Sequence, residues 1–320
     1  MSEIVITEAG SAVAAGAAGQ AGIDGNDRAR FLERHPCFSG KAHLKFGRIH
    51  LPVSPGCNIG CLFCARGIRP EGDPRDEVPG VASRTLLPTE AMVILEKALE
   101  LCPEISVVGV AGPGDSLVGG YAIETLALAK ARFPRLLACL STNGLLLKDK
   151  VDELARVPVD SITVTVNSLE PGTLAAINGR VVLDGRVLRG RDAAETLIAA
   201  QREGIAAAAE RTKAVIKINT VLIPGLNDAE IPGIAETCRS LGASVMNILP
   251  LIPQVGMADR RAPDCAELEA ARLAASVHLD VFRHCQHCRA DAAGLMGRNR
   301  DISKLLYGDA GRPEESFSHG

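Results

Sequence analysis

Three cysteines lie close together in the segment PGCNIGCLFCARG: Cys57, Cys61 and Cys64, with the spacing C-x3-C-x2-C. Thiolates so close in sequence can ligate one metal centre from a single loop. Three ligands are one too few for a closed zinc site or for a [4Fe–4S] cluster held only by thiolates. The fourth iron of such a cluster would stay open for a substrate or cofactor. The alternative is a zinc loop that takes its last ligand from a distant His or Cys.

The apolar segment RIHLPVS (48–54) predicts a strand that leads directly into this loop. A cysteine loop of this spacing after the first strand of a parallel barrel is typical of radical S-adenosylmethionine (SAM) enzymes. In those enzymes the open iron chelates the amino and carboxylate groups of SAM, and one electron cleaves the sulfonium to a 5′-deoxyadenosyl radical. We therefore expect a [4Fe–4S] cluster and SAM as cofactors.

Glycines and small polar residues follow the other predicted strands, where they could bind SAM. Gly112 and Asp115, in the run GPGD, offer close backbone approach and a carboxylate for the SAM ammonium group. Each such residue, taken singly, is more often part of a turn. Because the carboxyl ends of barrel strands meet at one face, we expect the whole set to lie together. The other candidates are Ser141, Thr142, Asn143, Thr165, Asn167, Ile218 and Asn219.

A second pair of cysteines, Cys285 and Cys288, has the spacing C-x2-C near the end of the chain. Such a pair can share one metal or one cluster edge, and a zinc half-site is the alternative interpretation. The pair needs a partner, and Cys37 of HPCFSG is the candidate. Further candidate ligands are Cys139, beside the STNG turn, and His43 and His50, before the first cysteine loop.

Alternating strands and helices are predicted to position these residues. Apolar strands joined by helical crossovers favour a parallel sheet that is covered on both faces. We expect the α/β class, as a partial (βα)6 TIM-like barrel with amino- and carboxy-terminal cluster-binding extensions, rather than an open doubly wound sheet. The strands are expected at 48–54, 105–112, 136–144, 161–168, 215–225 and 245–253, and the helices at 89–102, 120–133, 192–204, 228–242 and 265–279.

The composition limits the class of protein. The net charge of −3 over 320 residues gives no sign of a nucleic-acid or membrane-surface partner, and aromatic residues are few. No apolar run reaches the ~18 residues of a membrane span, and the amino terminus lacks the features of a signal peptide. We therefore expect a cytoplasmic protein whose ten cysteines serve metals or catalysis rather than disulfides. Cys102, Cys238 and Cys265 fall on helix patterns and are interpreted as packing thiols.

Three regions are expected along the chain. Residues 1–30 are predicted to be a flexible Ala/Gly-rich tail, and 31–300 a radical SAM domain with terminal cluster-binding segments. Residues 301–320 are predicted to be a polar, frayed carboxy-terminal tail.

Taken together, these motifs resemble the NifB family, the radical SAM proteins that build the core of the nitrogenase cofactor. The resemblance runs from HPC (35–37) to RADAAGLMG (289–297). Its most specific part is the RHC-x2-CRADA string, because generic radical SAM proteins lack it. It also rests on HPCFSGKAH, RIHLPVSPGCNIGCLFC, PGVAS, GVAGPGDSL, CLSTNG, KINTVLIPGLND and NILPLIP.

The resemblance implies a maturase, lyase-like or transferase-like, that fuses two further [4Fe–4S] clusters into an [8Fe–9S–C] precursor. One SAM would donate a methyl group, and a second would give the radical that abstracts hydrogen from it. Implied partners are cluster-donor and cofactor-carrier proteins and a ferredoxin or flavodoxin reductant. Cys57, Cys61 and Cys64 would hold the SAM cluster, Cys37, Cys285 and Cys288 one substrate cluster, and Cys139 with His50 (or His43) the other.

The sequence departs from the family in one segment. The family has a further cysteine shortly after the SAM-cluster loop, whereas this chain has none between Cys64 and Cys102. The family's acidic residue before Pro-Gly would be Asp76 or Glu77. The chain could therefore be a divergent paralogue. The alternatives are a radical SAM enzyme with an auxiliary cluster that acts on a peptide or small molecule, and a non-catalytic iron–sulfur scaffold. The intact cysteine triad argues against the scaffold, and the terminal string against the peptide or small-molecule enzyme.

Overall fold

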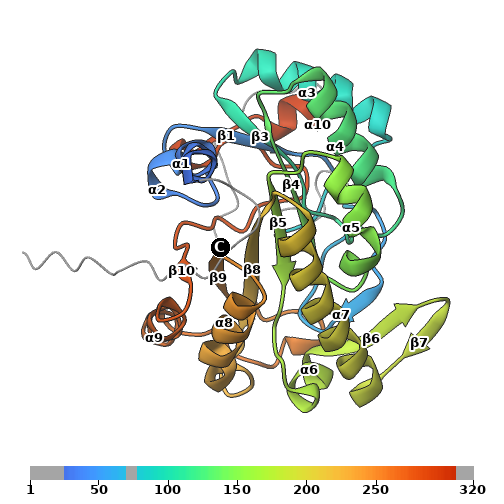
Figure 1. The fold of residues 1–320 in the computed structure, drawn as a ribbon, viewed down its shortest axis with the longest axis vertical. Helices are drawn as coiled ribbons and strands as arrows, with labels where there is room; N and C mark the ends of the chain where they lie inside the picture. The colour runs from blue at the N-terminus through green and yellow to red at the C-terminus, as the bar shows by residue number, and fades with distance from the viewer. Residues whose placement is uncertain (1–24, 70–77, 308–320) are drawn as a thin grey trace, which may run out of the picture.

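A parallel sheet forms the centre of the computed structural model, which describes residues 25–69 and 78–307 (Figure 1). Seven parallel strands are neighbours in the order β10-β9-β8-β5-β4-β3-β1. All six predicted strands are present in it, so the predicted α/β fold with a parallel sheet is confirmed. The strands are β1 (Gly47–His50), β3 (Ile105–Val110), β4 (Leu137–Thr142), β5 (Ser161–Thr165), β8 (Val215–Leu222), β9 (Val245–Pro250) and β10 (Asp280–Val281).

The sheet is an open, partial barrel. Within the described residues its edges are β10 and β12 (Arg300–Asp301), and β12 joins β1 through the antiparallel strand β11 (Ala293–Leu295). The predicted domain end at residue 300 is wrong, because α10 (Ser303–Tyr307) is folded onto the domain and Leu306 is buried. The predicted tail 1–30 likewise overlaps α1 (Gly25–Arg34), and residues 1–24 lie outside the described part.

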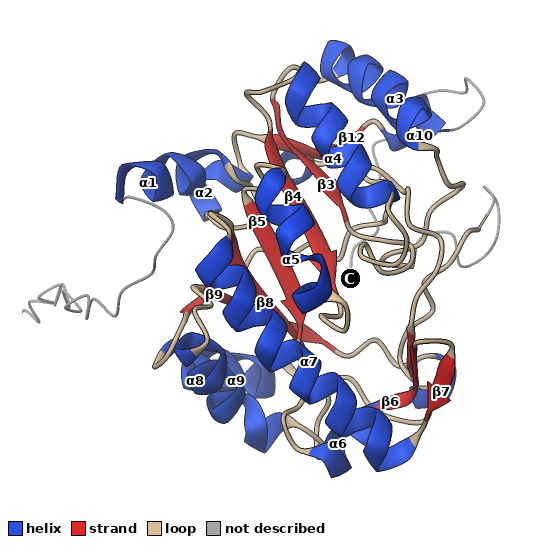
Figure 2. Ribbon diagram, turned by 45° about the vertical axis from the view of Figure 1, so that its right-hand side comes forward, coloured by secondary structure: helices blue, strands red, loops and turns tan. Residues whose placement is uncertain are grey.

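One face of the sheet carries the outer helices, and the main hydrophobic core lies between the two layers. Figure 2 shows α4, α5 and α7 in a row across this face. Two helix starts follow the usual capping chemistry: Pro88 begins α3, and Asp264 accepts a hydrogen bond from Glu267 N at 2.8 Å before α9. The helices are α3 (Pro88–Leu101), α4 (Tyr121–Arg132), α5 (Leu147–Arg156), α7 (Gly190–Arg211), α8 (Ile231–Ser240) and α9 (Cys265–Ser276), with short helices α2 (Gly40–His43), η1 (Asp228–Glu230), η2 (Val255–Met257) and η3 (Met296–Arg298).

A second, three-stranded sheet stands apart from the main one (Figure 2). It contains β2 (Ile59–Cys61), β6 (Asn178–Leu183) and β7 (Arg186–Leu188), and α6 (Pro171–Ile177) leads into it. The sequence does not predict this sheet, because β2 and β7 are each three residues long, too short to show an alternation of apolar and polar residues. Its position matters for function, since β2 is part of the cysteine loop and pairs with β6.

Helix α7 runs beyond the predicted end at Gly204, because this glycine is a packing position rather than a cap. A Cβ at Gly204 would lie 2.8 Å from the Leu147 Cβ of α5. We expect Gly204→Ala to lower the free energy of unfolding of the cluster-free protein by about 1–3 kcal/mol, as overpacking does. Urea unfolding followed by circular dichroism would measure it.

The matched control is Gly233→Ala in α8, where the added Cβ meets nothing within 4 Å. Helix propensity alone should stabilise that variant by up to about 1 kcal/mol. Equal effects of the two substitutions would contradict close packing of α5 on α7.

Candidate active site

The cysteine loop begins where the first strand of the barrel ends. Cys57 is exposed, and Cys61 and Cys64 are half-buried. Burial raises the pKa of the Cys61 thiol, and the neighbouring Cys64 and Cys57 raise it further. The three thiols thus lie within electrostatic range of one another, and their role as ligands of one centre stays a prediction. A raised pKa keeps the Cys61 thiol protonated unless a cationic centre binds it as a thiolate.

The GPGD run packs directly on the cysteine loop. Gly114 N donates to Ser54 O at 2.6 Å, and Asp115 N donates to Gly56 O at 2.8 Å. A Cβ at Gly114 would lie 1.9 Å from Gly56 O, so only glycine permits this approach. The close backbone approach that the sequence predicted at this run is therefore made to the chain's own loop, which it holds in place.

The carboxylate of Asp115 is buried and bound by the protein. It accepts hydrogen bonds from Leu117 N at 2.9 Å and from Asn143 N at 2.5 Å. Thr142 Oγ1 lies 3.0 Å from both carboxylate oxygens. Burial raises the pKa of Asp115, and these donors oppose that shift. The carboxylate thus links the ends of β3 and β4, and the backbone N–H of Asp115 joins them to the cysteine loop. Its predicted contact with the SAM ammonium group stays a prediction.

Asn143 connects this network to the cluster loop. Its Nδ2 donates to Asn58 Oδ1 at 2.6 Å and lies 3.9 Å from the Sγ of Cys57. Two buried polar atoms beside it, Ser54 Oγ and Asn58 Nδ2, have no partner within the described protein. Orphaned polar groups next to a triad of thiols fit a site that a polar ligand such as SAM completes.

The candidates on the later strands divide between two faces. Asn219 faces the barrel interior, where its Oδ1 accepts from Asn247 Nδ2 at 3.2 Å. Ile218 is fully buried in the core against the helices. Its predicted place beside the adenosine is therefore wrong for the side chain, because alternate residues of a strand point to opposite faces. Asn167 Oδ1 accepts from Val221 N, and the Thr165 carbonyl accepts from Gln201 Nε2, so both brace the scaffold.

Four further cysteines converge on one cavity inside the barrel. The cavity has a volume of about 170 Å³ and is lined by Cys37, Cys139, Cys285 and Cys288, as well as by Ser141. These thiols come from the amino-terminal segment, from β4 and from the carboxy-terminal segment. The first and last of these segments are more than two hundred residues apart in the sequence. The predicted grouping of Cys37 with Cys285 and Cys288 corresponds to this arrangement. Their role as ligands stays a prediction.

Two buried cations face these thiols. Arg48 on β1 donates through Nη1 to Cys37 Sγ at 3.3 Å and through Nη2 to Cys288 Sγ. Lys217 on β8 donates to Cys37 O at 2.9 Å and lies over the rings of Phe38 and Phe282, at 5.0 and 4.7 Å. Burial lowers the pKa of Lys217, and nearby thiolates raise it. No Asp or Glu among the described residues lines the cavity.

This charge balance bears on what the cavity can hold. Buried charges are costly unless they are paired, and two cations without a carboxylate leave positive charge uncompensated. Arg48 Nε in addition has no hydrogen-bond partner in the described protein. Thiolate-ligated iron–sulfur clusters are anionic, so the donor set and the buried cations fit such a cluster as an occupant.

Cys139 and His50 lie next to each other over Gly109. A Cβ at Gly109 would meet Cys139 Sγ at 2.7 Å and the His50 ring at 3.3 Å. Burial and, to a lesser extent, the charge of Arg48 lower the pKa of His50 to about 3, so the ring is neutral, as a metal ligand must be. His43 does not line the cavity, because its Nδ1 lies 3.2 Å from Pro36 O and its ring stacks on His284. The structure therefore favours His50.

The carboxy-terminal cysteine segment is held by the chain on both sides of the cavity. Asp291 accepts from Ser83 N at 2.7 Å, and Gly80 N donates to Cys288 O at 3.0 Å. Tyr307 OH donates to His50 O at 3.0 Å. The first two contacts join the PGVAS string to the CRADA string.

Sequence reasoning missed several residues of this cavity. Arg48, Lys217 and Asn247 line it, as do His35, His284 and His287. A lysine in the middle of the apolar strand VIKINTVL was the available signal, because a central strand seldom buries an unpaired charge. Cys102 and Cys238 are buried, as predicted, whereas Cys265 is exposed at the start of α9 and is not a packing thiol. Asp76 and Glu77 lie outside the described residues.

In the part of the chain that the structure describes, neither cysteine group is arranged as a preformed metal site, so the choice between a cluster and zinc stays a prediction. Among residues 25–69 and 78–307, no group of three or more His, Cys, Asp or Glu side chains is arranged to hold a metal ion. Of the helices that the structure describes, none has both the length and the apolar composition that a bilayer span requires.

Comparison with known sequences identifies relatives of the chain. Residues 51–238 match the Radical SAM superfamily. The chain is 45% identical over 276 residues to the FeMo cofactor biosynthesis protein NifB of Methanocaldococcus infernus, covering 86% of this chain and 90% of that protein. It is 43% identical to NifB of Methanocaldococcus jannaschii, covering 89% and 94%. Against NifB of Klebsiella pneumoniae the identity is 41%, over 83% of this chain and 58% of that longer protein.

Two solved structures share the fold. A radical SAM methyltransferase from Sphaerobacter thermophilus has a TM-score of 0.51 at 20% identity, over 72% of this chain and 64% of that one. Streptococcus suis SuiB, solved with S-adenosylmethionine bound, has a TM-score of 0.53 at 15% identity, over 76% and 52%. At these identities the likeness concerns the fold alone.

The contact of Gly114 with Gly56 generates a test of the cluster loop. We expect Gly114→Ala to separate the GPGD run from the loop, because the new Cβ and Gly56 O cannot occupy the same space. The variant should lose most of the iron held by Cys57, Cys61 and Cys64 after anaerobic reconstitution. Iron analysis and electron paramagnetic resonance would measure this loss.

Gly172→Ala is the matched control, since its Cβ position has no neighbour within 4 Å. That variant should keep its iron. A Gly114→Ala protein with an unchanged cluster signal would show that the close approach does not hold the loop.

Proposed function

The chain belongs to the NifB family of radical SAM enzymes, and from this premise we propose that it joins two [4Fe–4S] substrate clusters into a carbide-containing [8Fe–9S–C] precursor. The relatives named above are FeMo cofactor biosynthesis proteins, and we propose the same role for this chain. The observation that carries it is the cavity in which Cys37, Cys139, Cys285 and Cys288 converge beside two buried cations.

The cysteine triad would hold the SAM cluster of this reaction. When bound, that cluster and SAM supply methyl transfer and hydrogen abstraction by a carbon radical. The protein contributes position: Asp115 and Asn143 fix the loop that carries Cys57, and Gly114 sets its distance from β3. The same two strand ends reach both places: Asp115 and Asn143 contact the loop, and Ala111 and Ser141 line the cavity.

The cavity would hold the first substrate cluster beside Cys37, Cys285 and Cys288. Cys37, Cys285 and Cys288 supply three thiolates, and Arg48 already contacts two of those sulfurs. The cation offsets the negative charge of the ligated cluster, which lowers the cost of burying it. The buried aromatic rings of Phe38 and Phe282 add apolar surface to the cavity lining.

Cys139 and His50 would ligate the second substrate cluster. With these two side chains, the second site would offer fewer protein ligands than the first. A substrate that must fuse with its neighbour benefits from weak attachment, since ligands have to leave as the product forms. The missing family cysteine is therefore compatible with turnover. Cluster-donor and cofactor-carrier proteins would deliver the substrates and remove the product.

The two cysteine groups should have separable roles. We expect Cys61→Ala to abolish SAM cleavage, because the SAM cluster loses a ligand. With dithionite as the reductant, Cys285→Ala should still cleave SAM to 5′-deoxyadenosine but should stop methyl transfer, because the receiving substrate is lost. Chromatography of 5′-deoxyadenosine and S-adenosylhomocysteine would measure both products.

Cys265→Ala serves as the control, since this exposed thiol lies outside both groups. It should match the unsubstituted enzyme in both products. Equal loss of SAM cleavage in the Cys61 and Cys285 variants would contradict separate roles.

The number of clusters gives a second test. We expect about twelve irons per chain after anaerobic reconstitution, in three four-iron clusters, with a paramagnetic signal that changes when SAM is added. About eight would mean that one substrate site is absent and would favour a radical SAM enzyme with one auxiliary cluster. About four irons and no response to SAM would favour the scaffold.

A further inference from the structure

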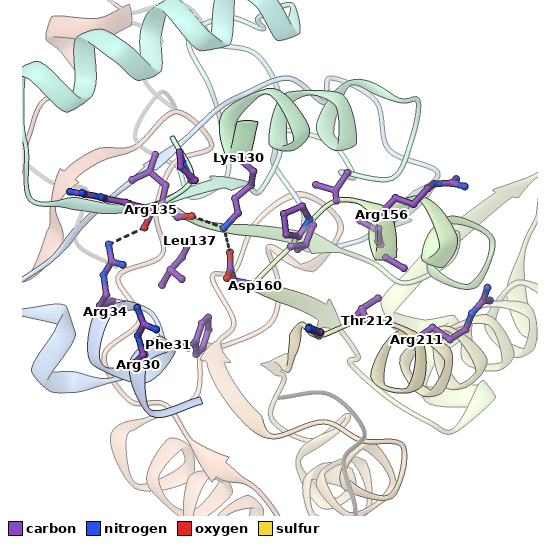
Figure 3. A pocket seen from close by; sticks show the side chains of 18 residues that line it. Arg30, Phe31, Arg34, Lys130, Arg135, Leu137, Arg156, Asp160, Arg211 and Thr212 are labelled. Atoms are coloured by element: carbon purple, nitrogen blue, oxygen red, sulfur yellow. Dashed lines mark hydrogen bonds and ion pairs between the residues drawn. The ribbon is translucent and has the colours of Figure 1, made fainter. Parts of the chain in front are cut away.

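A basic concavity lies at the end of the barrel opposite the cysteine loop. It has a volume of about 870 Å³ (Figure 3). Its lining comes from the residues just before β4, β5 and β8, namely Leu136, Val159 and Thr212, and from α1. Because the strands are parallel, this is the amino-terminal end of the barrel, whereas the cysteine loop leaves the carboxyl end of β1.

Cations dominate this surface. Asp160 is the only acidic residue among the described residues of the lining, and it is already bound to Lys130 at 3.1 Å and to Ala138 N at 2.7 Å. The protein as a whole carries a net charge of −3, so the positive charge of the concavity is opposite in sign to the net charge of the chain. Six further basic residues line it: Arg30, Arg34, Arg135, Arg156, Arg211 and Lys213.

Some of these cations have structural partners. Arg211 pairs with Asp152, and Arg34 donates to Arg135 O at 3.0 Å, as Figure 3 shows for the latter. Arg156 lies in the last turn of α5, where a cation also offsets the helix dipole. Arg30, Arg135 and Lys213 are exposed, and no carboxylate of the described chain lies within ion-pair distance of them.

The remaining cations are spread over separate elements. Arg30 comes from α1, Arg135 follows α4, and Lys213 follows α7. A single small anion would require cations that point to one spot. A surface of dispersed carboxylates on another protein matches cations distributed around a broad concavity, and such complementarity also accelerates encounter.

The floor of the concavity is one layer of side chains above the cysteine-lined cavity. Phe31 lines the concavity, and its ring centroid lies 5.0 Å from that of His35, which lines the cavity. Asp160 lines the concavity, and the next residue, Ser161, lies 3.5 Å from His35 Nε2. Leu137 is two residues from Cys139 on β4. A redox partner seated there would therefore lie close to an occupant of the cavity.

We propose that this concavity docks an acidic electron-carrier protein of the ferredoxin class, and that electrons enter the enzyme through the cluster in the cavity. The inference rests on the proposed function, in which each radical step consumes one electron. In the transfer, the reduced cluster of the carrier would lose one electron and a cluster held by Cys37, Cys285 and Cys288 would gain it, with no bond made or broken. The electron would pass on to the cluster held by Cys57, Cys61 and Cys64, which would supply reductive cleavage of the sulfonium S–C5′ bond of SAM to methionine and a carbon radical.

The test compares two reductants on the reconstituted holoenzyme. With dithionite, we expect the double variant Arg135→Glu/Lys213→Glu to form 5′-deoxyadenosine at the same rate as the unsubstituted enzyme. With a limiting amount of a reduced, acidic bacterial ferredoxin, the variant should form it about tenfold or more slowly than the unsubstituted enzyme, since electrostatic steering contributes factors of ten and above. Added salt should slow the unsubstituted enzyme with ferredoxin and hardly change the variant, because screening removes an attraction that the variant lacks.

The matched control is Arg186→Glu/Arg202→Glu, which reverses two exposed charges on β7 and on the outside of α7. It should behave as the unsubstituted enzyme with both reductants. An unchanged ferredoxin rate in the Arg135/Lys213 variant, or an equal loss in the control, would overturn the proposal. If charge reversal impairs folding, Arg135→Gln/Lys213→Gln must show the selective loss instead.

Binding of the oxidised ferredoxin separates this inference from the proposed function. Anisotropy of labelled ferredoxin should show binding to the unsubstituted holoenzyme and at least tenfold weaker binding to the Arg135/Lys213 variant. This result would support the docking site even if no 5′-deoxyadenosine were formed with dithionite. Equal binding by both proteins would overturn the docking site even if SAM chemistry were confirmed.

Discussion

The strict alternation of side chains along each parallel strand is the constraint on which this molecule depends. One face of the sheet has to bury apolar residues under the helices, and the other has to present polar residues and thiols to the barrel interior. On β8 this places Ile216 and Ile218 in the core and Lys217 and Asn219 in the interior. A shift of one residue in the pairing of β8 with β5 would exchange the two sets and destroy both the core and the cavity.

A second constraint is the placement of charge in the interior. Arg48 and Lys217 are buried beside thiols and not beside carboxylates, an arrangement that stability alone does not favour. Arg48 contacts Cys37 and Cys288, which come from opposite ends of the sequence, and so it brings the terminal segments onto one strand. The anionic cluster proposed above as substrate would complete this charge balance.

A third constraint is the close packing that positions the cysteine loop. Gly114 can approach Gly56 because it lacks a side chain, and the buried carboxylate of Asp115 then accepts backbone and hydroxyl donors from two strand ends. The loop itself pairs through β2 with β6, so the thiols are held from two sides although Cys57 is exposed. Rigid support of a loop that carries reactive groups is what preorganisation requires.

The sequence by itself determined the elements and the local chemistry. The six strands, most of the helices and the C-x3-C-x2-C loop follow from patterns that extend over a few residues, and such patterns reflect backbone period and metal ligation directly. The family also follows from the sequence, since its strings are contiguous. The short strands β2 and β7 could not be predicted, because their sequences show no alternation of apolar and polar residues. Hydrogen bonds to the partner strand β6, and not the strand propensity of their own residues, stabilise them.

Only the tertiary structure decided which distant residues meet. It brings Cys37 to Cys285 and Cys288, selects His50 over His43, and turns Ile218 away from the interior. It assigns the carboxylate of Asp115 to the protein's own donors, and it gathers cations from α1 and from the residues after α4 and α7 into one concavity. These outcomes depend on packing between segments far apart in the chain, which no local pattern of residues encodes.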